Sequence, residues 1–168
     1  MYQEDQVAAK RLRWLMPFLV ASNYLTIPLA QLARPWAKSV EFKHGVCRVV
    51  LDRVFLRQKG PDRGVVGWCL GHLNVLSEAG DNTRTRSHEL HHVEQQESAA
   101  LTGLVLGALF SALCKALWPL LVLWVGLPIL HYFASSAVSW LRGEDAYRGN
   151  HLEEGARAAA GDGCTHKR

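Results

Sequence analysis

The stretch Ser87 to Glu97 reads SHELHHVEQQE and carries side chains of the kind that bind metal ions. Within it, His88, Glu89 and His92 spell H-E-x-x-H. Residues four apart lie on one face of an α-helix, so both imidazoles can reach one metal ion. Neutral imidazole is a favoured zinc ligand, and the intervening carboxylate can accept a proton from an activated water molecule. The pattern predicts a zinc-dependent hydrolytic site, and the alternative is a solvated polar helix face.

A catalytic zinc needs a third protein ligand, and several later residues offer one. Glu153 and Glu154 open the last predicted helix, whose backbone can aim a carboxylate, but helical periodicity does not choose between them. His131 lies in an apolar block and is expected to be packed or membrane-facing. His91 is out of phase with the histidine pair and is expected to point elsewhere or to support a ligand. The remaining candidates are Glu144, Asp145 and His151.

Composition narrows the class of protein. The chain has 168 residues, a formal net charge of +4 and 49% hydrophobic residues, gathered mainly in two blocks. The basic residues are scattered without interleaved aromatics, so nucleic acid is not an expected partner. No glycine-rich strand-to-helix turn predicts a nucleotide cofactor. No pair of cysteines has the C-x-x-C spacing, which argues against a disulfide framework and a cysteine-based zinc site; the cysteines are Cys47, Cys69, Cys114 and Cys164.

The order of polar and apolar segments predicts three regions. Residues 1–38 combine a basic N-terminus with an apolar anchor or interfacial helix, and a signal peptide is the alternative. Residues 39–160 form one domain with an apolar hairpin inserted at 101–140, and its segment 40–80 is rich in valine and predicts short strands. Residues 161–168 form a flexible tail.

The apolar block 101–140 favours membrane lipid as a partner, with Lys115 as its only formal charge. It can form two passes, or one pass plus a helix lying on the membrane; the buried core of a small soluble helical protein is the remaining alternative. If residues on both sides of the block bind one metal ion, they lie on one side of the membrane. The block then crosses an even number of times or not at all, and Lys115 would mark the far turn of a two-pass hairpin.

Four linked motifs resemble a family of short, largely uncharacterised bacterial proteins with zincin-like features. They are CLGH at 69–72, TRSHELHHVEQ at 85–95, SWLRGEDAYRGN at 139–150 and HLEEGA at 151–156. Their order is that of the family, and they lie mainly in the second half of the chain. Two positions differ from the family pattern: His151 stands in place of a proline, and Gly155 stands in place of a second glutamate.

The resemblance implies that His88, His92 and Glu153 bind Zn²⁺ and that Glu89 is the general base. Further residues are expected to support the ligands or face a substrate: His72, His91, Tyr147 and Asn150. His72 in particular could face the site from an edge strand that binds an extended peptide, although a purely structural strand position is the alternative.

We therefore predict an α+β fold: a zincin-like minimal core of a short antiparallel sheet, the H-E-x-x-H helix and a closing helix, with apolar membrane-associated helices. The predicted function is that of a membrane-associated zinc metallopeptidase, in a bacterial inner membrane, acting on a peptide or protein substrate. The alternative is a non-catalytic membrane protein that keeps a zincin-like scaffold for interaction or assembly.

Overall fold

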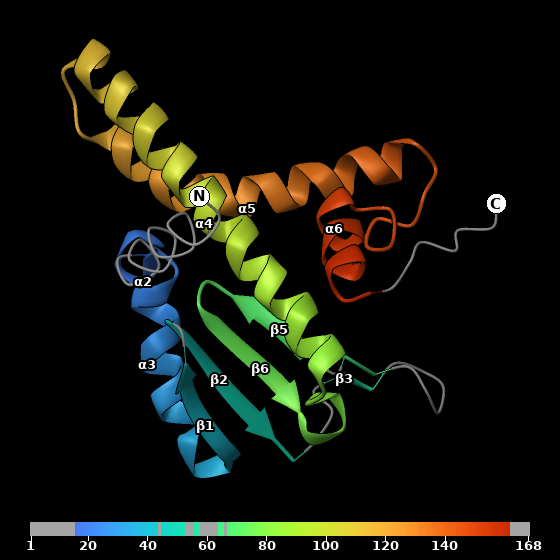
Figure 1. Cartoon of the computed structure of the whole chain (residues 1–168). Helices are drawn as coiled ribbons and strands as arrows, with labels where there is room; N and C mark the ends of the chain where they lie inside the picture. Colours follow the sequence, from blue (N-terminus) through green and yellow to red (C-terminus); the bar gives the residue numbers. More distant parts are fainter. Residues whose placement is uncertain (1–15, 44, 53–55, 58–63, 66, 162–168) are drawn as a thin grey trace, which may run out of the picture. The chain divides into compact units, whose positions relative to one another are not determined.

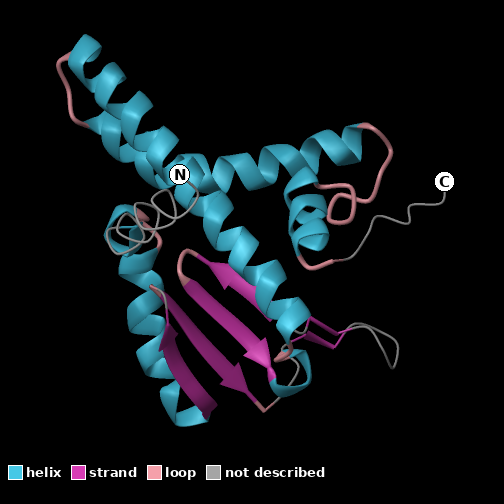
Figure 2. Ribbon diagram, viewed as in Figure 1, coloured by secondary structure: helices cyan, strands magenta, loops and turns pink. Residues whose placement is uncertain are grey.

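The computed structural model describes residues 16–43, 45–52, 56–57, 64–65 and 67–161. The chain divides into two compact units, Met1–Asp81 and Asn82–Arg168. The first unit contains the β-sheet, and the second contains the helices α4, α5 and α6 (Figure 1; Figure 2). The predictions for the basic N-terminus and for most of the tail lie outside the described residues.

The first unit is built on a four-stranded sheet with the order β1-β2-β6-β5. Its strands are β1 (Ala37–Lys43), β2 (Val46–Leu51), β5 (Gly67–Leu70) and β6 (Leu73–Ser77), while β3 (Leu56–Arg57) and β4 (Gly64–Val65) pair separately. β1 pairs with β2 and β5 pairs with β6 in antiparallel fashion, but β2 and β6 run parallel. The predicted α+β class is confirmed, and the antiparallel sheet is wrong at this central pair. Residue patterning reports which faces are buried but not the direction of a neighbouring strand.

The core of the first unit lies between the sheet and α3 (Asn23–Ala33). All five residues of β6 are buried, as expected for one of the two central strands of the sheet. Ala30 of α3 packs with Cys47, Val49, Leu73 and Val75. The small alanine side chain lets the helix lie close to these residues of β2 and β6.

The predicted N-terminal anchor is not one continuous helix over the described residues. It forms α2 (Met16–Leu19) and, after a turn, α3, which ends before the 3-10 turns η1 (Arg34–Trp36). The 11 residues of α3 rise about 16 Å, roughly half of a bilayer core. Leu25 and Leu29 are nonetheless exposed on the face away from the buried Ala30, so contact of this face with a membrane surface stays a prediction.

The second unit begins, after the 3-10 turn η2 (Glu78–Gly80) of the first, with a helical hairpin of α4 (Thr83–Cys114) and α5 (Trp118–Leu141). Lys115 follows α4 in the left-handed conformation, with φ of 52°, and lies in the turn. The chain thus turns at Lys115 between two long helices, and α4 continues without a break from the H-E-x-x-H segment into the apolar block. Figure 1 shows the first half of α5 beside the C-terminal half of α4, and the second half leading away towards α6 (His151–Ala159).

Two glycines set the contact between the hairpin helices. A Cβ added at Gly103 would lie 2.5 Å from the carbonyl oxygen of Leu123, and one at Gly107 would lie 2.7 Å from the Cα of Leu120. No side chain fits at such distances, so the backbones approach closely at both positions. The spacing G-x-x-x-G is typical of close helix pairs in membranes.

In α5 the large apolar side chains are mostly exposed and the buried residues are small or polar. This is the reverse of a helix in the core of a soluble protein. The buried residues of α5 are Pro119, Ser135 and Ser139, whereas large apolar side chains are exposed: Leu121, Val122, Val125, Ile129, Leu130, Phe133 and Val138. α4 and α5 are each long and apolar enough to cross a membrane by length and composition. The exposed apolar surface argues against the alternative in which this block is the buried core of a soluble protein.

The glycine contact predicts a position-specific cost of adding one methyl group. Gly107→Ala should lower the free energy of unfolding by about 1–3 kcal/mol, because the helices must move apart. Gly126→Ala is the matched control, since its Cβ would lie 3.8 Å from the nearest neighbouring atom, the Cδ1 of Leu130. Thermal unfolding of the detergent-purified variants, followed by circular dichroism, measures both. Equal stability of the two variants would contradict the close approach.

Candidate metal site

The first two residues of the site are held by the N-terminal part of α4. This helix is capped by Asn82, whose side-chain oxygen accepts a hydrogen bond of 2.9 Å from the backbone N–H of Thr85. An Asn side chain in this position satisfies a free N–H group of the first turn. One turn further, His88 and His92 project side by side, with their Nε2 atoms 3.2 Å apart. Their rings meet edge to face.

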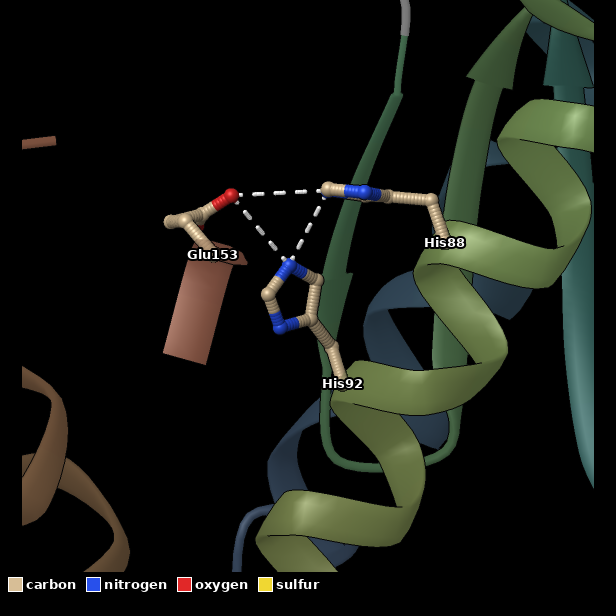
Figure 3. Close-up of side chains that lie close together, drawn as sticks. All are labelled: His88, His92 and Glu153. Atoms are coloured by element: carbon tan, nitrogen blue, oxygen red, sulfur yellow. Dashed lines mark hydrogen bonds and ion pairs between the residues drawn. The ribbon is translucent and has the colours of Figure 1, made fainter. Parts of the chain in front are cut away.

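The third residue, Glu153, comes from α6. Its Oε2 lies 3.4 Å from the Nε2 of His88 and 3.5 Å from the Nε2 of His92 (Figure 3). The three side chains converge on one point from two helices of the same unit. Among the described residues, His88, His92 and Glu153 form the one group of three that could hold a metal ion.

The dimensions of this triangle fit a tetrahedral metal ion. Ligand atoms about 2.0–2.1 Å from zinc in a tetrahedron are about 3.3–3.4 Å from one another. The observed separations of 3.2, 3.4 and 3.5 Å scatter closely around that value. The Glu153 Oε2 is buried and has no hydrogen-bond partner among the described residues, which is costly for a carboxylate without a cation. Two imidazoles and one carboxylate are a donor set that suits zinc and leaves a fourth position open.

The surroundings favour the ionised form of the carboxylate. Burial alone would raise the pKa of Glu153, but the His88 and His92 rings beside the carboxylate hold the pKa well below its usual range. Burial opposes the charged form of His92, yet the Glu153 carboxylate beside it raises the pKa of the ring. The group therefore attracts positive charge to its centre, whether as protons or as a metal ion.

Glu89 lies next to this group. It is 4% exposed, and its Oε2 has no hydrogen-bond partner among the described residues. Burial raises the pKa of Glu89, and the charge of Glu153 adds to the increase against the opposing effect of His88 and His92. A buried carboxylate with a raised pKa and a free oxygen is able to accept a proton.

Gln95 connects the two helices at the site. Its Oε1 lies 2.9 Å from the Nδ1 of His92, and its Nε2 donates a 2.9 Å hydrogen bond to the backbone oxygen of Leu152. As an acceptor for Nδ1–H, the amide selects the tautomer of His92 in which Nε2 is free to bind a metal. The second bond fixes the backbone directly before Glu153. The sequence carried a signal for this role that we missed, because Gln95 is three residues after His92 on the same helix face.

The carboxylate of Glu153 is also held from α5. The hydroxyl of Tyr132 donates a 3.1 Å hydrogen bond to Oε1, the oxygen that does not face the histidines. Local spacing gave no indication of this contact, since 21 residues separate the two side chains. Tyr147, which we expected near a substrate, is 57% exposed. Partial burial and the Glu153 carboxylate raise the pKa of its hydroxyl to about 12.

Asn150 was expected to support the ligands, and it lies at the start of α6. It is fully buried, and its Oδ1 accepts hydrogen bonds from the backbone N–H of Leu152 at 2.9 Å and from the hydroxyl of Ser135 at 2.6 Å. Its Nδ2 donates to the hydroxyl of Ser136 at 2.9 Å. Asn150 thus caps α6 and ties it to α5, which fixes the helix that carries Glu153.

The two departures from the family pattern both have a local explanation. A Cβ at Gly155 would lie 3.0 Å from the Nε2 of His91 and 3.3 Å from the Nε2 of Gln95, so glycine permits α6 to approach α4 closely. His91 therefore lies against α6 and does not belong to the metal-binding group. The Nδ1 of His151 lies 2.5 Å from the hydroxyl of Ser135, an interaction that proline would not make.

The remaining predicted residues lie elsewhere. His72 belongs to the first unit, in the turn between β5 and β6, and is 3% exposed. Its Nδ1 is 2.8 Å from the side-chain nitrogen of Asn23, and its backbone N–H bonds the Asn23 Oδ1. This burial favours the structural alternative for His72 over contact with a substrate. The other candidate third ligands are outside the metal-binding group: His131, Glu144, Asp145, His151 and Glu154.

Comparison with known proteins gives no match: no protein-family profile, no curated protein and no solved structure resembles the chain significantly. The site rests on the geometry of His88, His92 and Glu153.

The triangle predicts which of two adjacent glutamates matters for metal binding. Elemental analysis of purified wild-type protein should give about one zinc per chain, and Glu153→Gln should lose it because the amide carries no charge. Glu154→Gln is the matched control and should keep the metal. Loss of zinc in the Glu154 variant alone would overturn the assignment.

The contacts of Gln95 predict a weaker effect on the same site. Gln95→Leu should reduce zinc affinity by about 10–100-fold, because His92 loses the partner that fixes its tautomer. Gln95→Glu keeps an acceptor for His92 but loses the donor to Leu152, so its affinity should lie between wild type and Gln95→Leu. Competition with a chromophoric chelator measures all three, and identical affinities would exclude a supporting role.

Proposed function

We propose that this protein is a membrane-associated, zinc-dependent hydrolase that cleaves peptide bonds. The observation that carries the proposal is the triangle of His88, His92 and Glu153, whose ligand atoms have the separations of a tetrahedral zinc site with one position open. Glu89 lies beside it with the properties of a general base.

The proposed chemistry divides the work between the metal and the protein. A bound zinc ion would polarise a substrate carbonyl and lower the pKa of a water molecule. Glu89 would take the proton from the attacking water and deliver it to the leaving amine. Tyr132 would hold Glu153 in place from the side away from the metal, and the hydroxyl of Tyr147, protonated at neutral pH, is a candidate donor to substrate.

The membrane part of the proposal rests on α4 and α5. Their turn at Lys115 is 23 residues from His92 along α4, a rise of about 35 Å. The hydrocarbon core of a bilayer is roughly 30 Å thick. With Lys115 at one surface, the metal site would lie just beyond the opposite surface, in water and next to lipid headgroups. A bacterial inner membrane is the compartment that we propose.

A second candidate function is non-catalytic, with the metal fastening α6 to α4 in a protein that serves interaction or assembly. The observation that favours it is the burial of Glu89, which is only 4% exposed and would need to become accessible to act on a substrate. The close contact of α6 with α4 at Gly155 is also what a structural joint requires. The two functions predict different results for one isosteric substitution.

Glu89→Gln separates the two functions. If the site is catalytic, the variant should bind zinc as wild type does and lose about 10²–10⁴-fold in peptide hydrolysis, because the amide cannot accept the proton. Hydrolysis is followed by mass spectrometry with a peptide library, next to elemental analysis of each variant. Cleavage that persists at the wild-type rate in Glu89→Gln would reject the mechanism. A wild-type protein that binds zinc but cleaves no peptide would favour the structural role.

If the hairpin of α4 and α5 crosses the membrane, its tip (the turn at Lys115) and the metal site lie on opposite sides of the membrane. Cys114, exposed at the tip, and Ala158→Cys, exposed on α6, are each studied as the single cysteine of the chain. In oriented vesicles, a membrane-impermeant maleimide should label one from outside and the other only after permeabilisation. Labelling of both from the same side would refute the two-pass arrangement.

A further inference from the structure

The second unit contains a cavity that the proposed chemistry does not use. It has a volume of about 580 Å³ and lies between α4 and α5. Its walls come from Ser98, Ala99 and Thr102 of α4 and from Leu127, Leu130, His131 and Ala134 of α5. The α4 wall continues to His91, Glu94 and Gln95, close to the metal-binding histidines. The α4 wall therefore changes from polar side chains near the site to smaller, less polar ones further along the helix, and the α5 wall is apolar except for His131.

The cavity exists because the hairpin helices pack closely in one half and separate in the other. Gly103 and Gly107 bring the backbones together near the tip. Beyond Gly103, α5 contains Pro128, which lacks the N–H for a helical hydrogen bond and favours a bend. Figure 1 shows the second half of α5 leading away from α4. The cavity is the wedge-shaped space, with a largely apolar wall, that remains between the two helices.

The dimensions of this wedge match one leaflet of a bilayer. From His91 to Thr102 it follows α4 for 11 residues, a rise of about 17 Å. Half of a bilayer core measures roughly 15 Å. Counted from Lys115, Thr102 lies about 20 Å and His91 about 36 Å along the helix. In the proposed orientation the wedge thus extends from near the midplane to the surface on the side of the metal site.

We propose that this cavity holds an alkyl chain of a membrane lipid, with the lipid headgroup at the His91 and Glu94 end. Three observations support this occupant. The polarity of the α4 wall changes along the cavity as that of an amphiphile does. The length fits one acyl chain. The helices around it expose apolar side chains outward, among them Ile129 and Phe133, so lipid surrounds its mouth in a membrane.

The inference rests on the membrane association in the proposed function and is independent of its hydrolytic activity. An apolar cavity left empty costs stability through lost dispersion contacts, so an occupant that fits is favoured. A lipid chain in this place would brace the second half of α5, and with it Tyr132 and Ser135, which contact Glu153 and Asn150. The metal site would then be supported in part by lipid.

The experiment counts lipid bound to the full-length protein by native mass spectrometry, in detergent micelles supplied with dioleoyl phosphatidylcholine. Wild type should retain one lipid per chain. Ala134→Trp, which fills the cavity, should lower retention at least 5-fold, and Thr102→Phe should do so from the opposite wall. Ala137→Trp adds the same bulk at an exposed position of α5 outside the cavity wall and should retain lipid as wild type does. Circular dichroism verifies that each variant is folded.

Several results would overturn the inference. Equal retention in Ala134→Trp and Ala137→Trp would place lipid on the outer surface only. If the wild-type protein needs detergent for solubility but retains no lipid, it is membrane-associated but does not bind an alkyl chain in the cavity. A dimer that dissociates in Ala134→Trp would identify a second copy as the occupant. Release of the protein from membranes by high salt alone would reject membrane association and the inference with it.

Discussion

The structure of the second unit depends on one buried carboxylate. Glu153 is 3% exposed, and its Oε2 faces two imidazole nitrogens without a hydrogen-bond partner among the described residues. A carboxylate in such a place is tolerated only if positive charge stands opposite it. Protons on His88 and His92 can supply that charge, but a divalent cation supplies more of it and satisfies all three ligand atoms at once. The close arrangement of α4 and α6 follows from this requirement.

The neighbouring contacts fix the position of that carboxylate. Gln95 joins His92 to the backbone next to Glu153, Asn150 caps α6 and fastens it to α5, and Gly155 lets α6 lie against α4. Together these contacts link α6 to both α4 and α5. Because they converge on one side chain, the loss of any one should loosen the site more than it destabilises the fold.

Much of the site could be predicted from sequence because it depends on local geometry. That His88 and His92 lie on the same face of α4 follows from helical spacing alone. The choice of Glu153 over Glu154 did not follow from periodicity; it was implied by the family resemblance and agrees with the position of Glu153 in the triangle. Tyr132, by contrast, contacts Glu153 only because α5 folds back along the hairpin and passes close to α6. The spacing of these residues in the sequence does not indicate such a contact. The parallel pairing of β2 and β6 and the division of the N-terminal apolar segment into two helices depend equally on tertiary contacts.

The central claim is that two imidazoles and one carboxylate bind zinc with an open fourth position. X-ray absorption at the zinc edge, on detergent-purified protein loaded with one equivalent of zinc, tests it most directly. The account predicts four light-atom ligands at about 2.0–2.1 Å with the outer-shell scattering of two imidazoles. A sulfur shell at about 2.3 Å, or a spectrum without imidazole scattering, would show that zinc binds elsewhere and would contradict the site described.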